Sequence, residues 1–170
     1  PHPAYPDPLW SRGLGDVYKR QEDGYLYVMA RTDDVINVAG HRLSTGQLEE
    51  VLADHPDIAE CAVIGVADQL KGQLPLGLIC LYPNCNRLQD DITAEAVALV
   101  KDRVGRVSSF NLIVVIERLP KTRSGKVLRG TMAKIADGEN WNMPATIDDP
   151  AILDEIKMAL QSIGYAGGKS

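Results

Sequence analysis

The stretch RTDDVINVAGHRLSTG, residues 31–46, decides how the fold is interpreted. Two adjacent acids lead into a short β-branched run over 33–38, and a glycine turn follows it. Gly40 lets the backbone approach a ligand closely, and the guanidinium groups of Arg31 and Arg42 suit phosphate. An ordinary hairpin with solvated charges is the other interpretation of the same residues.

Apolar periodicity extends this organisation along the chain. The runs YLYVMA, IAECAVIGV, LGLICLY and NLIVVI predict strands, and a loop over 67–75 joins the middle two. Helical spacing predicts four helices: 45–54, capped by Ser44 or Thr45; 93–104; 126–136; and 148–162, capped by Asp148 or Asp149. The order of the predicted strands and helices along the chain indicates an α+β fold, in which helices pack on one side of a small antiparallel or mixed sheet.

A second polar stretch, PKTRSGKVLR over residues 120–129, concentrates positive charge in a loop. Gly125 precedes Lys126, which predicts a mobile loop that carries an exposed lysine. It is not a Walker motif, because an upstream glycine is missing and Val127 follows the lysine. A solvated basic loop and a lysine delivered to an anionic substrate both remain open.

Composition narrows the classes of function. The chain has 170 residues, 45% of them hydrophobic, and a formal net charge of −5. This charge argues against nucleic acid or an anionic membrane surface as the main partner. Cys61, Cys80 and Cys85 have no paired spacing, and no apolar run reaches the ~18 residues of a membrane helix. We therefore expect reduced thiols and a cytoplasmic location.

Taken together, the two motifs resemble the C-terminal signature pair of acyl- and aryl-CoA synthetases, luciferases and nonribosomal adenylation domains. The segments INVAGHRLSTG, ECAVIGVADQLKGQLP, LPKTRSGKVLRGTMAKIADG and IDDPAILDEI are similar to acetyl- and especially propionyl-CoA synthetases. Ala39, where the acetyl enzymes typically carry Ser, favours propionate. Ala30 departs from the family's glycine, and the acidic ribose-binding motif expected upstream of Glu22 is absent.

The residues near the start of the chain and the family resemblance together predict the domain limits. Residues 11–21, SRGLGDVYKRQ, resemble a translated transposon-end sequencing adapter. We therefore expect residues 1–21 to be such an artefact or a disordered leader, and the native chain to continue upstream of residue 22. Residues 22–140 are expected to form the C-terminal domain of the adenylate-forming superfamily, and 141–170 a helical extension.

The implied reaction is the ATP-dependent ligation of a short carboxylic acid, propionate or acetate, to coenzyme A through an acyl-AMP. ATP, Mg²⁺ and coenzyme A are the implied substrates and cofactors. Lys126 matches the lysine of the adenylation step, where an ammonium stabilises developing negative charge. Its acetylation would remove that charge. Asp33 matches the hinge about which the domain turns between the two steps.

The remaining implied sites are binding sites. Arg31 and Arg42 match ATP/AMP contacts, and the Ala39, Gly40 and His41 turn matches the CoA-binding face. Lys101 stands where acetyl-CoA synthetases carry a CoA-binding arginine, and lysine lacks the bidentate fork. A cation site of backbone carbonyls matches Ala53, His55 and Ile58, supported by the negative end of a helix. For His55 itself, a surface position at the helix end is expected.

The implied partners are an N-terminal AMP-binding domain of the same chain, which holds the acyl and adenine pockets, and the small-molecule substrates. No nucleic acid and no membrane is expected, and this segment alone is expected to be inactive. Two alternatives remain: a stand-alone binding or regulatory module, and an adenylation domain that serves a carrier protein. A nucleic-acid role for residues 121–129 is disfavoured because aromatic residues are not interleaved there.

Overall fold

The computed structural model describes residues 16–20, 26–31 and 34–167, with side chains from residue 34 onward. Strand β1 (Asp16–Arg20) pairs antiparallel with β2 (Leu26–Arg31). β1 lies inside the range 1–21 that the sequence analysis sets apart, and that division stays a prediction. Asp33 lies outside the described residues.

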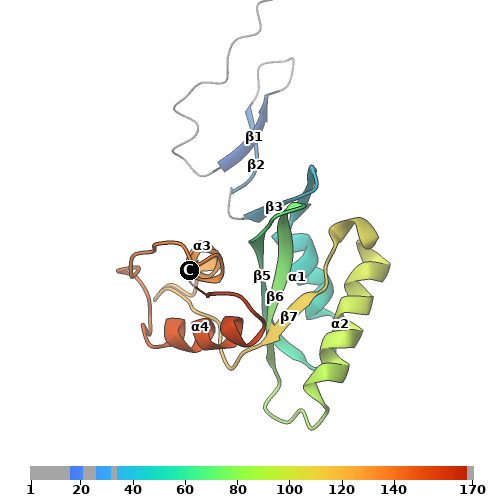
Figure 1. Cartoon of the computed structure of the whole chain (residues 1–170), viewed down its shortest axis with the longest axis vertical. Coiled ribbons are helices and arrows are strands. Elements are labelled where there is room, and N and C mark those ends of the chain that lie inside the picture. The colour runs from blue at the N-terminus through green and yellow to red at the C-terminus, as the bar shows by residue number, and fades with distance from the viewer. Residues whose placement is uncertain (1–15, 21–25, 32–33, 168–170) are drawn as a thin grey trace, which may run out of the picture.

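A second, five-stranded sheet forms the centre of the described part (Figure 1). Its strands are β3 (Val35–Val38), β4 (His41–Ser44), β5 (Ile58–Asp68), β6 (Gly72–Leu81) and β7 (Leu112–Val115). β3 pairs with β4 and β6, and β5 with β6, all antiparallel, whereas β7 runs parallel to β6. The predicted mixed sheet is therefore confirmed.

The long β5–β6 hairpin corrects the loop expected over 67–75. From Glu60 onward the strands pair in continuous register up to Asp68 opposite Gly72, which leaves residues 69–71 as the turn. The Asp68 carboxylate accepts the backbone N–H groups of Leu70 at 3.0 Å and Lys71 at 2.7 Å, and Gly72 takes a φ of +80°. The Asp68 carboxylate and Gly72 thus close a three-residue turn. The polar residues of 67–75 had suggested a longer loop.

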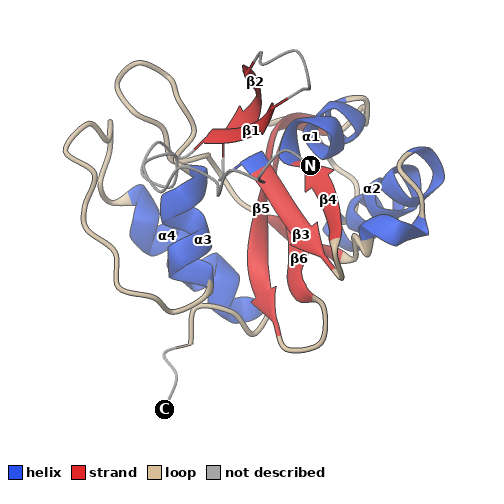
Figure 2. Ribbon diagram, turned by 90° about the horizontal axis from the view of Figure 1, so that it is seen from above, coloured by secondary structure: helices blue, strands red, loops and turns tan. Residues whose placement is uncertain are grey.

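Helices cover both faces of this sheet, not one face as expected (Figure 2). One face carries α1 (Thr45–Ala53) and α2 (Gln89–Arg103), and the other carries α3 (Arg129–Ala136) and α4 (Ile152–Ser162). The reason lies in β5, where Val63 is buried toward α1 while Ala62 and Ile64 are buried toward α3. A strand without polar alternation is buried on both sides.

Helix ends differ from the expected ones. α2 begins earlier than residue 93, and α3 and α4 begin later than residues 126 and 148. Ser44 occupies the N-cap position of α1 but makes no side-chain capping hydrogen bond. The Asp149 carboxylate accepts the backbone N–H of Ala151 at 3.0 Å, just before α4.

The predicted extension 141–170 shares the core of the preceding domain. Side chains of α4, including Ile156 and Leu160, are buried together with residues of β5, β6 and α3. Thr122 and Ile147 form an isolated antiparallel bridge, and the Ala166 N–H donates to the Ala136 carbonyl at 2.9 Å. The packing therefore runs across residue 140. The division between 22–140 and 141–170 stays a prediction from the sequence.

Candidate functional site

The β3–β4 hairpin presents the first motif. Its strands pair from Val35 opposite Ser44 to Val38 opposite His41, so Ala39 and Gly40 form the turn. Both have positive φ, +48° and +87°, as a two-residue hairpin turn of this twist requires. A Cβ placed on Gly40 would meet nothing within 4 Å. The turn backbone is therefore open to a ligand.

Two other segments fix this turn in place. The Ala39 N–H donates to the carbonyl oxygen of Lys71 at 2.8 Å, and Val38 pairs with Gly72. The Lys71 ammonium in turn donates to Ser109 Oγ at 2.9 Å. The hairpin tip, the β5–β6 turn and the 105–109 segment after α2 thus form one connected cluster, which we call the acceptor end.

The predicted binding residues at this end are placed as follows. His41 and Arg42 are exposed on β4, and Lys101 is half-buried in the last turn of α2. Figure 1 places the hairpin and the end of α2 at the same end of the central sheet. Arg31 ends β2, and its side chain is not among those described.

The Lys126 loop is more constrained than a mobile basic loop. Thr122 N–H donates to the Lys126 carbonyl at 2.8 Å, and Thr122 Oγ1 accepts the Lys126 N–H at 3.0 Å. Gly125, at φ +84°, donates its N–H to the Thr122 carbonyl at 2.8 Å. Lys121 also pairs with Val127. The backbone is thereby fixed while the Lys126 residue stays exposed.

Neighbouring cations of this loop serve the fold. The Lys121 ammonium lies 2.7 and 2.9 Å from the carboxylate oxygens of Glu60 on β5. Arg129 forms a two-pronged pair with Glu49 of α1, at 2.8 and 2.7 Å, and Glu49 also accepts the Val63 N–H at 2.8 Å. The sequence analysis missed both acids, because neither is near the loop in the chain.

The two motifs are attached to opposite ends of β5. The Lys126 loop is tied to Glu60 near the start of β5, and the hairpin tip is tied to Gly72, opposite Asp68 at its end. At about 3.3 Å per residue, these attachment points lie roughly 25 Å apart. Lys121 and the hairpin tip are therefore attached to different ends of the strand, while Arg129 is joined to its middle through Glu49, which accepts the Val63 N–H.

The turn between α1 and β5 holds the predicted carbonyl set, Ala53, His55 and Ile58. His55 is buried, with 5% of its surface exposed, which corrects the expected surface position. Its Nδ1 accepts the Asp57 N–H at 3.2 Å, and Nε2 lies 3.3 Å from a Glu95 carboxylate oxygen. The His55 carbonyl already accepts the Ile58 N–H at 3.2 Å.

Arg87 completes this polar cluster from the loop before α2. It pairs with Glu95 and, at 2.8 Å, with Asp57. The hydrogen bonds from Arg87 hold the pKa of the Glu95 carboxyl below its ordinary value of 4.5. In the described part of the chain, no three His, Cys, Asp or Glu side chains converge as metal ligands. A cation here would depend on backbone oxygens and the negative end of α1.

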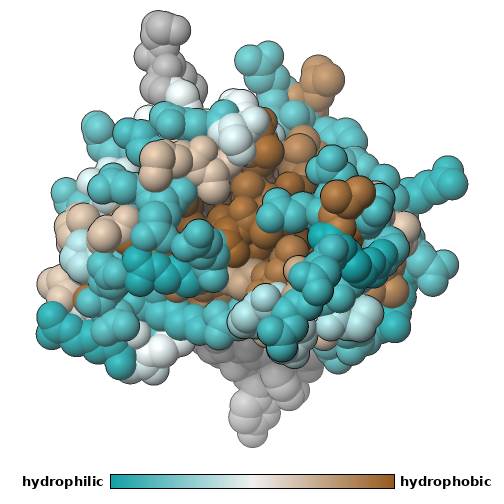
Figure 3. All heavy atoms as spheres, turned by 90° about the horizontal axis from the view of Figure 1, so that it is seen from below, coloured by the Kyte–Doolittle hydropathy of each residue, from teal (hydrophilic) through white to brown (hydrophobic). Residues whose placement is uncertain are grey.

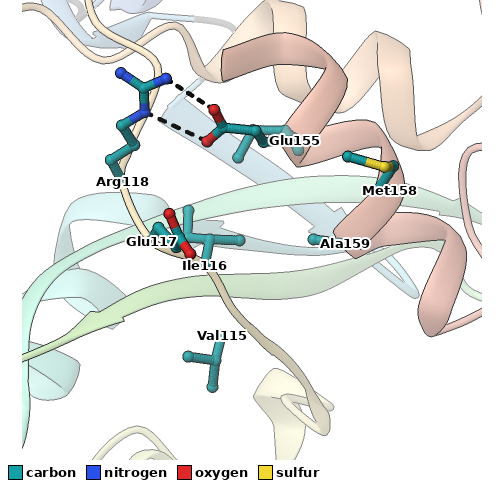
Figure 4. Close-up of a pocket in the computed structure, with 8 residues that line it drawn as sticks. Val115, Ile116, Glu117, Arg118, Glu155, Met158 and Ala159 are labelled. Atoms are coloured by element: carbon teal, nitrogen blue, oxygen red, sulfur yellow. Dashed lines mark hydrogen bonds and ion pairs between the residues drawn. The ribbon is translucent and has the colours of Figure 1, made fainter. Parts of the chain in front are cut away.

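A groove of about 420 Å³ lies between the end of β7 and α4 (Figure 4). Apolar side chains gather in a hollow on the corresponding end of the molecule (Figure 3). Arg118 at the rim pairs with Glu155 at 2.8 Å and with Asp149 at 2.7 Å. None of the residues predicted to bind or react lines the groove, whose lining is Val115, Ile116, Glu117, Arg118, Glu155, Ile156, Met158 and Ala159.

Comparison with known proteins places this arrangement in a family. Residues 47–126 match the model of the AMP-binding enzyme C-terminal domain. The chain therefore belongs to the family of AMP-binding enzyme C-terminal domains, as the signature pair predicted. Within the described residues, no helix is long and apolar enough to cross a membrane.

Individual relatives narrow the resemblance. An uncharacterized protein of Pseudomonas aeruginosa is 55% identical over 86% of this chain and 23% of its own length. A mitochondrial short-chain family acyl-CoA synthetase of Dictyostelium discoideum is 45% identical over 82% and 20%. The propionate–CoA ligase of Escherichia coli is 43% identical over 84% and 23%. The chain thus spans about a fifth of the length of these relatives.

A solved structure supports the fold assignment. An anthranilate CoA ligase in complex with anthranoyl-AMP matches 73% of this chain and 24% of its own, with a TM-score of 0.60 and 30% identity. The expected fold class, an α+β C-terminal domain of the adenylate-forming type, is confirmed.

Proposed function

We propose that this chain is the C-terminal domain of an ATP-dependent short-chain acyl-CoA synthetase whose preferred acid is propionate. The observation that carries the proposal is the presence, on one domain, of an exposed lysine, Lys126, in a hydrogen-bonded loop and of an open glycine turn at Gly40. The names of the Dictyostelium and E. coli relatives support the acid class. An AMP-binding domain of the same protein would supply the acyl and adenine pockets.

In the first step the acid's carboxylate attacks the α-phosphate of ATP, forming acyl-AMP and releasing pyrophosphate. Lys126 places its ammonium where negative charge accumulates on the carboxylate and α-phosphate, which lowers the barrier. The hydrogen bonds between Thr122 and Lys126 fix the loop backbone. The Lys126 side chain therefore loses less conformational freedom when it takes up its reactive position.

In the second step the thiolate of CoA attacks the acyl carbonyl carbon and AMP departs. The open backbone at Ala39 and Gly40 would let the pantetheine arm pass. Because the basic loop and this turn are held by different segments of β5, we propose that the domain turns between the steps. Asp33, which precedes β3 in the sequence, is the proposed hinge.

The remaining proposed contacts are also divided between the nucleotide and CoA. Arg31 and Arg42 are proposed to bind the nucleotide, and His41 and Lys101 to contact CoA. ATP would bind as its magnesium complex. The carbonyls of Ala53, His55 and Ile58 are proposed to hold a cation at the end of α1, where the helix dipole favours positive charge.

The test uses the complete enzyme encoded by the gene that contains this chain. Lys126→Ala is compared with Lys134→Ala, an exposed lysine on α3. We expect Lys126→Ala to abolish propionate-dependent ATP–pyrophosphate exchange, yet to convert supplied propionyl-AMP and CoA to propionyl-CoA. Acetate and butyrate are assayed in parallel. Unchanged exchange in Lys126→Ala would refute the role of the lysine and favour a binding module.

A further inference from the structure

We propose that Glu60 is a positioning residue for Lys126, and that it acts through its ion pair with Lys121. This inference rests on the proposed function, because it adds to the adenylation step a residue of β5 that lies outside both motifs. Glu60 would not touch the substrates. It would fix the loop from which Lys126 reaches them.

The first argument is the backbone that connects Lys121 to Lys126. The isolated bridge between Lys121 and Val127 joins the two arms of the loop. Next to Lys121, Thr122 forms hydrogen bonds of 2.8 and 3.0 Å with the Lys126 backbone. On its other side, the Lys121 carbonyl accepts the Asp148 N–H at 3.0 Å. A shift of Lys121 would therefore move Thr122 and, through it, the backbone of Lys126.

The second argument is an irregularity in β5 that directs Glu60 toward this loop. In a regular strand, side chains two residues apart point to the same face. The pairing with β6 shifts register between Ile58 and Glu60, and Ile58 packs in the core beside α1 and α2. Cys80, which pairs opposite Glu60, lies in the core on the α3 and α4 side. A bulge of this kind re-aims a side chain and is frequent next to functional sites.

The third argument is the exposure of the ion pair. The Glu60 side chain keeps 48% of its surface exposed and Lys121 keeps 35%. Pairs this exposed add little to the stability of a whole domain. Both Glu60 carboxylate oxygens nevertheless accept from the Lys121 ammonium, at 2.7 and 2.9 Å, which defines its direction. The effect of the pair is therefore local, on the placement of the loop against β5.

This placement matters for one step of the reaction and not for the other. The stabilisation that the Lys126 ammonium gives to the transition state depends on its distance from the developing charge, so a displaced loop lowers the rate of adenylation. The turn at Gly40 is attached instead to Gly72, at the far end of β5. Thioester formation should therefore not depend on Glu60.

The experiment measures the two half-reactions of the complete enzyme: propionate-dependent ATP–pyrophosphate exchange, and conversion of supplied propionyl-AMP and CoA to propionyl-CoA. The variants are Glu60→Gln and Lys121→Met. Glu155→Gln is the matched control, because it breaks a similarly exposed pair with Arg118 outside the loop. We expect both variants to lower the kcat of exchange about three- to tenfold at little-changed KM, with thioester formation unaffected. The control should leave both half-reactions unchanged.

A charge exchange tests whether the pair itself is responsible. Glu60→Lys alone places two ammonium groups together and should lower exchange further than Glu60→Gln does. Adding Lys121→Glu restores the attraction with its direction reversed, so the double variant should recover most of the lost exchange. Urea midpoints of Glu60→Gln and Lys121→Met should stay close to that of the control, which shows that the fold is retained.

The outcomes separate this inference from the proposed function. Unchanged exchange in Glu60→Gln overturns the inference, and so does an equal fall in both half-reactions, which would mean that the pair only supports the fold. Failure of the charge exchange to recover activity overturns it as well. If Lys126→Ala leaves exchange intact, the proposed function itself fails, and the inference with it.

Discussion

Replacing Arg129 by methionine should destabilise the fold strongly, although Arg129 belongs to the basic loop. Arg129 and Glu49 join α3 to α1 across the edge of β5, where the same carboxylate accepts the N–H of Val63. Methionine keeps much of the side-chain volume but leaves the Glu49 carboxylate with this one N–H donor from β5. The substitution therefore measures mainly the cost in stability of a Glu49 carboxylate that has lost its cation, and only slightly the loss of packing.

The expected loss of stability depends on how deeply the Arg129–Glu49 pair is buried. Removing one partner of a fully buried pair costs about 3–5 kcal/mol. The Glu49 side chain keeps 15% of its surface exposed and Arg129 keeps 21%, so water offsets part of that penalty. We therefore expect Arg129→Met to lower the free energy of unfolding by about 2–3 kcal/mol. Adding Glu49→Gln removes the stranded charge and keeps an acceptor for Val63, so the double variant should recover more than half of the loss.

The assay is urea unfolding of the 170-residue chain followed by circular dichroism. With a slope of about 1–3 kcal/mol per molar urea, the midpoint of Arg129→Met should fall by roughly 1–2 M at an unchanged slope. Arg103→Met is the control, because Arg103 and its partner Asp54 are about half exposed. A midpoint loss for Arg129→Met no larger than that of the control would refute the reasoning from burial.

Three further outcomes follow from the packing and the charges. Gly77→Ala places a Cβ 2.9 Å from the Phe110 ring and should lower the free energy of unfolding by about 1–3 kcal/mol, measured by thermal denaturation. Burial raises the pKa of the Cys61 and Cys80 thiols from 9.0 to about 11, so iodoacetamide should label both about a hundredfold more slowly at pH 8 than after unfolding, by mass spectrometry. The hydrogen bonds from Arg118 keep the pKa of Glu155 below its ordinary value of 4.5, so the stability they contribute is present above pH 4.5 and is lost as the pH falls below it. Arg118→Gln should therefore make the urea midpoint less sensitive to pH in that range. An unchanged acid response in this variant would contradict the prediction.

Much of the fold could be predicted because its signals are local. The strand β3 and the turn after it follow from a β-branched run and Gly40, whereas the strand β4 and the positive φ of Ala39 were not predicted. Helix α1 and the cores of β5 and β6 follow from apolar spacing over a few residues. The burial of both faces of β5 was readable as well, since IAECAVIGV lacks polar alternation, but one-sided helix packing was expected instead.

What could not be predicted depends on contacts between distant residues. Glu49 lies 80 residues from Arg129 in the chain, and Glu60 lies 61 from Lys121, so nothing near the basic loop indicates which of its cations are neutralised. His55 was expected at the surface because it ends a helix before a proline. Its burial arises from α2, whose Glu95 packs over it from a distant part of the sequence.

The placement of the two motifs on β5 has a consequence for control. Lys121 is attached to Glu60 near the start of β5, and the β3–β4 turn is attached to Gly72, opposite Asp68 at the other end of the strand. One hydrogen-bonded ladder therefore fixes the spacing between the basic loop and the glycine turn. Under the proposed function, the two motifs would move together as one body, so a ligand that immobilised either motif would also immobilise the other.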